Sequence, residues 1–395
     1  MDNKKLFLLL VALFAFLNFS HSVLKEAAFS PFNDFGNYWL NARLLTEGYN
    51  AWDDAPVVRA RRQELAVTYQ VCLSDAPLHS PGFFVFFRPF SGFPYRSSAL
   101  LWLAAGIAAL AAALAVFLRC FGLYKPREHL LSVFFLVFSF WPLIEQIHDG
   151  QPNFFILLLV CLVLCALKKE RYFLAGFIFG ITAQFREYIG IAALFFLVTR
   201  NWRALAGFLA GVVSLKLCAV LMYGWQVEPA YWARMLAMFG RSVYPFPGNL
   251  SFPATVWRVI APVIGSGGAF CAGAVCVFAL TFFAWARGVG KKDSVAGFLL
   301  FVILAVLVSP WVHESHFTML LPAVVLVWPI AGGGIVRVAG LFIAAYLLMG
   351  LKYSLNSFPA FHAGLPALVS TGKLMGVILL FIVWWVLAGK ERIDA

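Results

Sequence analysis

A series of twelve apolar segments constrains the fold of this chain more than any other feature. The first covers residues 6–24, and the other eleven lie near residues 98–118, 130–146, 154–167, 172–185, 188–199, 203–223, 269–286, 295–309, 316–330, 336–351 and 373–388. A transmembrane helix needs about 20 mostly apolar residues. The chain is also 62% hydrophobic and only 12% charged, whereas a soluble domain carries roughly 25% charged residues. The pattern predicts a bundle of membrane-spanning helices.

The basic residues indicate how these segments are oriented. Just over half of the 30 Lys and Arg residues lie in the two terminal tails or in alternate short turns, such as residues 119–127, 168–171 and 287–292. The positive-inside rule assigns such turns to the cytoplasm. We therefore predict an all-α polytopic protein of about twelve spans in the inner or plasma membrane, with cytoplasmic N- and C-termini. Because the basic residues form no single patch, the net charge of +12 does not indicate nucleic-acid binding.

The segments predict a single transmembrane domain over residues 1–395, with one long extracytoplasmic loop at residues 25–97. This loop mixes charged, aromatic, Pro and Gly residues, and we expect it to contain short interfacial helices. The first apolar segment is either a retained anchor or a cleaved signal peptide. In both cases the loop that follows lies outside the cytoplasm. Most of the seven cysteines lie inside apolar segments, which predicts neither a disulfide framework nor a metal site.

Asp34 is the first polar residue with a chemical role to consider, because Asp, His, Asn and Gln residues collect in the predicted outside turns. It lies in the sequence Phe32-Asn33-Asp34-Phe35-Gly36-Asn37-Tyr38. A carboxylate among aromatic residues near a membrane is partly desolvated, which raises its basicity. This favours a general base that takes a proton from a hydroxyl group. The alternative is that Asp34 caps a helix over residues 38–46.

Two further outside turns carry polar residues that suit sugar or phosphate binding. Gln151 and Asn153 have amide groups that can bond sugar hydroxyls or phosphate oxygens, unless Asn153 only caps the following helix. Arg186 lies in the apolar stretch 172–199, where an ionisable residue indicates function by default. Arginine can hold a phosphate through two parallel hydrogen bonds. The alternative is that Arg186 and Glu187 neutralise each other.

His313 and His316 lie in the turn Ser309-Pro310-Trp311-Val312-His313-Glu314-Ser315-His316. Their spacing places both rings on one helical face, but it does not match the H-E-x-x-H zinc motif. We predict hydrogen bonds from these histidines to phosphate or sugar, with metal ligation as the alternative. The sequence implies no divalent metal and no other cofactor beyond a co-substrate.

Several blocks of residues, in order along the chain, resemble glycosyltransferase family 87, a branch of the polytopic GT-C superfamily that includes polyprenyl-phosphate-mannose-dependent mannosyltransferases. The blocks are Asp34-x3-Tyr38-x3-Ala42-x-Leu44-x3-Gly48, Ser80-Pro81 with Arg88-Pro89, Gly150-Gln151-x-Asn153, Ala175-Gly176-x3-Gly180, Asn249-x-Ser251 with Arg258, and Ser309-Pro310-x2-His313-x2-His316. Two positions depart from the usual family pattern: Arg186-Glu187 replaces Lys-Pro, and His79-Ser80-Pro81 replaces Tyr-Pro-Pro.

The resemblance implies that Asp34 is the catalytic base and that the short outer turns bind the donor phosphate. The implied substrate-binding residues are Asn37, Tyr38, Gln151, Asn153, Arg186, Asn249, Arg258, His313 and His316. The implied activity is inverting transfer of a hexose, expected to be mannose, from a polyprenyl-phosphate sugar to a lipid or glycan acceptor outside the cytoplasm. The other hypotheses are a secondary transporter and a non-catalytic protein of envelope assembly. The latter predicts that Asp34, Arg186 and His313 lie far apart.

Overall fold

The computed structural model describes residues 3–29, 33–71, 77–125, 127–239, 246–288, 294–332, 336–353 and 358–388, and every regular element in these ranges is a helix. The first nine helices are α1 (Asn3–Phe29), α2 (Asn33–Thr46), α3 (Pro56–Tyr69), α4 (Pro81–Ser91), α5 (Tyr95–Phe121), α6 (Arg127–Phe138), α7 (Trp141–Asp149), α8 (Asn153–Lys168) and α9 (Tyr172–Phe185). They are followed by η1 (Glu187–Ala193), α10 (Leu194–Val198), α11 (Trp202–Tyr223), α12 (Val227–Phe239), α13 (Phe252–Gly288) and α14 (Ser294–Val308). The last are η2 (Glu314–Leu320), α15 (Leu321–Gly332), α16 (Val336–Gly350), η3 (Pro359–Phe361), α17 (Ala367–Ser370) and α18 (Gly372–Leu387). The predicted all-α class is confirmed.

Four helices in the described ranges are long and apolar enough to cross a membrane. They are Lys5–Ala28, Tyr95–Phe121, Trp202–Tyr223 and Phe252–Arg287. The pair α6 and α7 forms a fifth candidate, bent by 45° at its break. Seven further apolar helices have 10–17 residues, which is short for a bilayer core of about 30 Å. The helical membrane architecture agrees with the sequence, whereas twelve spans and cytoplasmic termini stay predictions.

Two regions differ from the segments expected from sequence. Residues 130–146 were expected to form one helix, but α6 ends at Phe138 and α7 begins at Trp141, with Pro142 in its first turn. Proline is favoured at the start of a helix and excluded from its interior, which explains the break. Residues 224–268 lie between two of the predicted segments and were not expected to form a long helix, but they contain α12 and the beginning of α13. The latter turns at Gly265 (φ 76°), a conformation that glycine adopts without strain.

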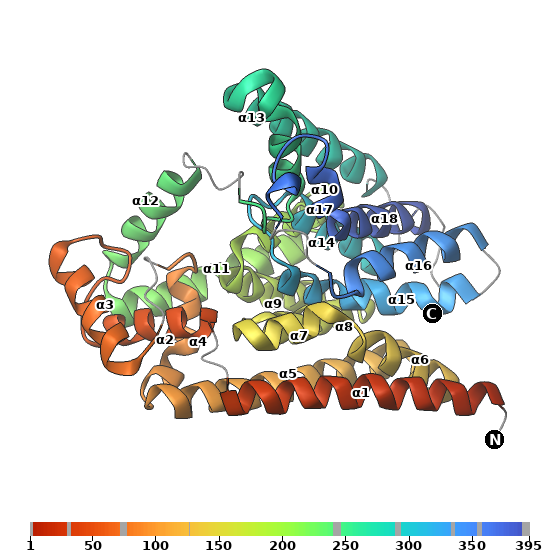
Figure 1. The fold of residues 1–395 in the computed structure, drawn as a ribbon, viewed down its shortest axis with the longest axis horizontal. Coiled ribbons are helices and arrows are strands. Elements are labelled where there is room, and N and C mark those ends of the chain that lie inside the picture. Colours follow the sequence, from red (N-terminus) through yellow and green to blue (C-terminus); the bar gives the residue numbers. More distant parts are fainter. Residues whose placement is uncertain are drawn as a thin grey trace.

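The long loop after α1 forms a helical cap. Helices α2, α3 and α4, together with α12, lie at the end of the molecule opposite the start of α1 (Figure 1). Their aromatic side chains make the core of the cap: Phe35 contacts Phe87 and Trp102 with ring centroids 5.5 and 6.1 Å apart. The Trp39 indole N–H donates to the Phe93 carbonyl at 3.2 Å. The cap fixes the start of α2, and hence Asp34, against α4 and α5. Short helices in this loop were predicted and are confirmed.

Helices α9 and α11 pack in close backbone contact through glycines. Gly176 and Gly180 on α9 face Gly207 and Gly211 on α11, each pair spaced four residues apart. A Cβ atom at any of these positions would lie 1.8 to 2.2 Å from a carbonyl oxygen of the other helix. Small residues at this spacing are typical of helix pairs packed within a membrane. The contact positions the C-terminal end of α9, which directly precedes Arg186.

Replacing Gly180 by Ala is expected to destabilise the protein. The new Cβ would meet the Phe208 carbonyl oxygen at 2.2 Å and the Val212 nitrogen at 2.9 Å, so the two helices must separate. Overpacking of this kind costs about 1–3 kcal/mol, which thermal unfolding of the purified protein in detergent will register as a lower Tm. Gly340→Ala is the matched control, because a Cβ there meets nothing within 4 Å. Equal Tm values for the two variants would contradict the close packing.

Candidate active site

Asp34 lies in the first turn of α2, where the positive end of the helix dipole favours a carboxylate. Its Oδ2 accepts a hydrogen bond from Nε2 of Gln151 in the turn after α7. The Asp34 side chain therefore bonds a second element of the fold, and the alternative in which it only caps its own helix does not describe this contact. Burial raises the pKa of the Asp34 carboxyl above its usual value, and the Arg186 charge and the Gln151 hydrogen bond offset part of this shift. Asp34 is thus a carboxylate of increased basicity, held by a neutral amide.

The turn that carries Gln151 is fixed on several sides. Gly150 ends α7 with φ 68° and donates its N–H to the carbonyls of Gln146 and Ile147. Its own carbonyl accepts a hydrogen bond from the Trp102 indole at 2.8 Å. The Gln146 amide donates to the Gln151 carbonyl at 2.6 Å and accepts from the Asn153 N–H at 3.1 Å. Gln151 is therefore held in place when it bonds its two partners.

Arg186 is the second partner of Gln151. It stands between α9 and η1 in extended conformation, and its Nη2 donates to Oε1 of Gln151. Ser80 ties the same junction to the cap, because its Oγ donates to the Gln184 carbonyl at 2.7 Å. The Glu187 carboxyl lies next to the Tyr231 hydroxyl and also within electrostatic range of Arg186, so the hydrogen bond of the guanidinium to Gln151 is additional to this attraction. The expected alternative, in which Arg186 and Glu187 only neutralise each other, does not describe these contacts.

Hydrogen bonds therefore join Asp34, Gln151 and Arg186 in one chain, which we call the Asp34–Arg186 relay. It brings together three residues from the first loop, the turn after α7 and the junction after α9. Tyr38 lies one helical turn after Asp34, and its phenol interacts with Arg186. Its ring contacts His79 with centroids 4.7 Å apart. The sequence predicted four of these five residues as site residues; it noted His79 only as a departure from the family pattern.

Buried polar atoms without a hydrogen-bond partner in the described protein surround Arg186. They are Nε2 of His79, Nε of Arg186, the hydroxyl of Tyr188 and Nε2 of His316. Nδ1 of His316 accepts the His313 backbone N–H at 3.4 Å, so a neutral His316 ring carries its proton on Nε2 and can donate it. Buried polar groups in native proteins are almost always paired. This set of atoms therefore indicates a site for a polar ligand rich in acceptor oxygens.

His313 and His79 are placed to act as neutral imidazoles. Burial, followed by the charge of Arg186, lowers the pKa of His313 to about 4. The same two causes hold the pKa of His79 well below its usual value. Neutral histidines can donate and accept hydrogen bonds, but they add no charge. The positive charge of the site therefore comes from Arg186.

The other predicted residues hold the walls of the site together. The Asn153 amide donates to the Ser315 carbonyl at 3.0 Å, which joins α8 to η2. The Asn249 amide donates to the Pro310 carbonyl at 2.8 Å and accepts the Val312 N–H at 3.1 Å. Arg258 donates to the carbonyls of Pro247 and Asn249 at 3.0 and 3.2 Å. Asn37 bonds Asn41 within α2. In these contacts the four residues have a positioning role.

Comparison with known proteins decides which chemistry this arrangement serves. The model of glycosyltransferase family 87 matches residues 78–310, more than half of the chain. The chain belongs to glycosyltransferase family 87. It is therefore a glycosyltransferase, and the match covers Gln151, Arg186, Asn249 and Arg258 but ends before His313 and begins after Asp34. No solved structure gives a significant match.

Two curated relatives of this family-87 chain share one name. One is the polyprenol-phosphate-mannose-dependent alpha-(1-2)-phosphatidylinositol pentamannoside mannosyltransferase of Mycolicibacterium smegmatis, 27% identical over 295 residues, or 71% of this chain and 69% of the relative. The other has the same name in Mycobacterium tuberculosis and is 26% identical over 267 residues, or 65% of this chain and 60% of that relative. The chain thus aligns with well over half of each.

The family-87 site also contains residues that the sequence analysis did not select. Tyr188 stacks near His316 with centroids 5.7 Å apart, and Lys373 on α18 forms an ion pair of 2.5 Å with Glu314. Lys373 is only 1% exposed, and this buried pair joins two elements that are distant in sequence. Tyr188 could not be selected from the sequence, because nothing there distinguishes an aromatic residue of the site from an aromatic residue of the core.

Within the described ranges, His, Cys, Asp and Glu side chains form no group of three that could hold a metal ion.

Proposed function

We propose that this glycosyltransferase moves mannose from a polyprenyl-phosphate donor to a lipid or glycan acceptor on the extracytoplasmic side of the membrane, with inversion at the anomeric carbon. The names of the two relatives support a polyprenyl-phosphate-mannose donor. The observation that carries the proposal is the Asp34–Arg186 relay, because it joins a buried base to a cation suited to a phosphate.

In this mechanism Asp34 takes the proton of the acceptor hydroxyl while the hydroxyl oxygen attacks the anomeric carbon. The bond between that carbon and the phosphate oxygen breaks, and the polyprenyl phosphate leaves with the electron pair. A phosphate is a weak base, so no general acid is needed, in contrast to glycosidases, which use two carboxyl groups. Arg186 stabilises the developing phosphate charge, and Nε2 of His316 and the Tyr188 hydroxyl supply further donors.

The non-catalytic hypotheses fit these contacts less well. An envelope scaffold predicted that Asp34, Arg186 and His313 lie far apart, yet Gln151 links the first two and Arg186 lowers the pKa of the third. A transporter predicts ionisable residues near the middle of the membrane. Asp34 instead lies at the start of α2, in the helical cap at one end of the molecule (Figure 1). Family membership also favours the enzyme.

A donor panel tests the proposal. Purified protein in nanodiscs is given radiolabelled polyprenyl-phosphate mannose, polyprenyl-phosphate arabinose or GDP-mannose, with crude membrane lipid as acceptor. We expect transfer from polyprenyl-phosphate mannose alone. Transfer from GDP-mannose, or from none of the donors despite measurable donor binding, would contradict the proposal.

The pH dependence of transfer is expected to report the raised pKa of Asp34. A general base is active when deprotonated, so kcat/KM for the acceptor falls as the pH drops through the pKa of Asp34, which lies above the usual 3.8. The Gln151 hydrogen bond favours the charged carboxylate. Gln151→Leu therefore raises this pKa further and shifts the acid limb to higher pH. Gln63→Leu on the exposed face of α3 is the control, and an unshifted limb in Gln151→Leu would contradict the role of the relay.

A further inference from the structure

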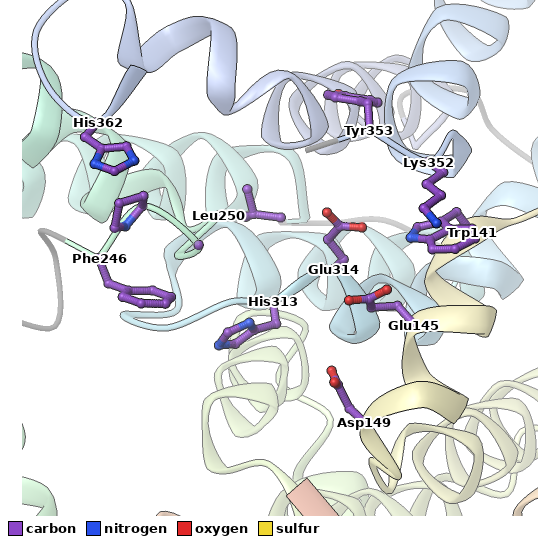
Figure 2. Close-up of a pocket in the computed structure, with 12 residues that line it drawn as sticks. Trp141, Glu145, Asp149, Phe246, Leu250, His313, Glu314, Lys352, Tyr353 and His362 are labelled. Carbon is purple, nitrogen blue, oxygen red and sulfur yellow. The ribbon is translucent and has the colours of Figure 1, made fainter. Parts of the chain in front are cut away.

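A cavity of about 640 Å³ lies between α7, the start of η2 and the segments around Phe246 and Lys352 (Figure 2). Three of its lining residues, Trp141, Glu145 and Asp149, come from α7, and His313 and Glu314 come from the start of η2. Figure 2 shows the carboxyl groups of Glu145 and Glu314 in the region between His313 and Trp141. Cavities of roughly 300–1,000 Å³ hold drug-sized ligands, so this one can hold more than a single sugar ring.

Two residues of the cavity wall, Asp149 and His313, lie close to the Asp34–Arg186 relay. Asp149 directly precedes the Gly150-Gln151 turn, and it lies within electrostatic range of Asp34 as well as of Glu145 and Glu314. His313, which also lines the cavity, is within electrostatic range of Arg186. A ligand in the cavity can therefore present one end to Asp34 while its body extends along α7.

The three lining residues of α7 lie on one side of the helix because of their spacing. Trp141, Glu145 and Asp149 are spaced four residues apart, so they share one face of the helix. All three are partly exposed, whereas residues 142–144, 146 and 147 are buried. This face offers an indole ring at one end and two carboxyl groups along its length. Carboxyl oxygens accept hydrogen bonds from hydroxyl groups, and an aromatic wall suits the C–H face of a sugar ring.

The charge of the cavity distinguishes it from the phosphate site. Its cation Lys352 lies over the Trp141 ring at 4.5 Å, and the Glu314 carboxyl is paired with Lys373 at 2.5 Å. The Glu145 carboxyl offsets the charge of Lys352, and the Asp149 carboxyl adds hydrogen-bonding oxygens. A phosphate group is therefore favoured at Arg186 and disfavoured along α7. An uncharged polyhydroxyl ligand suits the α7 face.

We infer that this cavity binds the uncharged sugar end of the acceptor, held by Trp141 and by the carboxyl groups of Glu145 and Asp149, with its reactive hydroxyl at Asp34. This rests on the proposed function. The donor sugar must lie where its phosphate meets Arg186 and its anomeric carbon faces the hydroxyl held at Asp34, because this carbon is bonded to the phosphate and attacked from the side of the base. The cavity extends away from that position along α7, which is where the rest of an acceptor must go.

The test uses Glu145→Gln, which keeps the size of the side chain and removes its charge, with Glu64→Gln on the exposed face of α3 as the matched control. Octyl α-D-mannoside is the acceptor probe and polyprenyl-phosphate mannose the donor. We expect the KM for the mannoside to rise about tenfold in Glu145→Gln, the size of one lost hydrogen bond to a charged group. The kcat and the donor KM are expected to stay the same. An unchanged acceptor KM, or a rise in donor KM instead, overturns the assignment.

A binding measurement without donor separates this inference from the proposed function. Saturation-transfer NMR on the full-length protein in nanodiscs compares octyl α-D-mannoside with its 6-phosphate. We expect the uncharged probe to bind better, and to bind more weakly to Glu145→Gln and Trp141→Phe than to the wild type or Glu64→Gln. This result supports the cavity even for a protein that transfers no mannose. Stronger binding of the phosphorylated probe, or equal binding by all four proteins, overturns the inference.

Discussion

Asp34→Asn is expected to lower kcat for mannose transfer by about 10²–10⁴-fold, the usual contribution of a general base. Asparagine has nearly the same shape as aspartate but cannot accept a proton from the acceptor hydroxyl. It can still accept a hydrogen bond from Gln151, whose Nε2 bonds Asp34 in the native protein. Steady-state transfer from radiolabelled polyprenyl-phosphate mannose measures the effect, and donor binding is expected to change little.

The matched control for Asp34→Asn is Asp54→Asn. Asp54 is an exposed carboxylate of the same cap, paired with Arg234 at 3.1 Å. The control is expected to retain wild-type transfer. If Asp34→Asn and Asp54→Asn were equally active, Asp34 would not be the base. If Asp34→Asn lost donor binding instead of kcat, its carboxylate would serve the donor rather than the acceptor.

Arg186→Ala is expected to lower kcat by about 10²–10³-fold, which is the loss typical when one donor to a developing oxyanion is removed. The guanidinium supplies the positive charge of the site, since burial and Arg186 itself keep His79 and His313 neutral near pH 7. Arg186→Lys is expected to recover only part of the rate, because an ammonium group does not provide two parallel hydrogen bonds. Kinetics with polyprenyl-phosphate mannose measure both variants.

The control for Arg186 is Arg119→Ala. Arg119 is exposed in the last turn of α5, 24 residues after the start of this helix beside Phe35, or roughly 36 Å along its axis. Its removal is expected to leave kcat unchanged. An Arg186→Ala enzyme with full kcat and a higher donor KM would assign Arg186 to ground-state binding alone. Full recovery of kcat by Arg186→Lys would show that a positive charge is enough for catalysis, without the two parallel hydrogen bonds of the guanidinium.

The sequence identified residues that meet in the structure, but it did not predict how they meet. Asp34, Gln151 and Arg186 were identifiable because polar groups are costly among apolar segments, and all three belong to one relay. Their direct linkage was not predictable, since it depends on how α2, α7 and α9 meet in space. Trp141 could have been found with Glu145 and Asp149 from their four-residue spacing, but only once residues 141–149 were known to form a helix of their own.

Asn249 and Arg258 illustrate the limit of assigning binding roles from a family resemblance. Both were expected to bind substrate, and both form hydrogen bonds to carbonyl groups of residues 246–251 and 309–312. A loop with few helical bonds must satisfy its backbone groups with side chains, so an Asn or Arg there has this second use. The sequence does not distinguish the two uses. The spacing of Gly176 and Gly180 was used only as part of the family resemblance, and their close packing against α11 comes from the structure.

The anomeric configuration of the product tests the mechanism most directly. Mannose is transferred from a polyprenyl-phosphate mannose of known configuration to octyl α-D-mannoside, and the new linkage is assigned by NMR. Direct attack by a hydroxyl that Asp34 deprotonates predicts inversion at the anomeric carbon. Retention would require a covalent intermediate on a protein nucleophile and would contradict Asp34 as a general base in a single displacement.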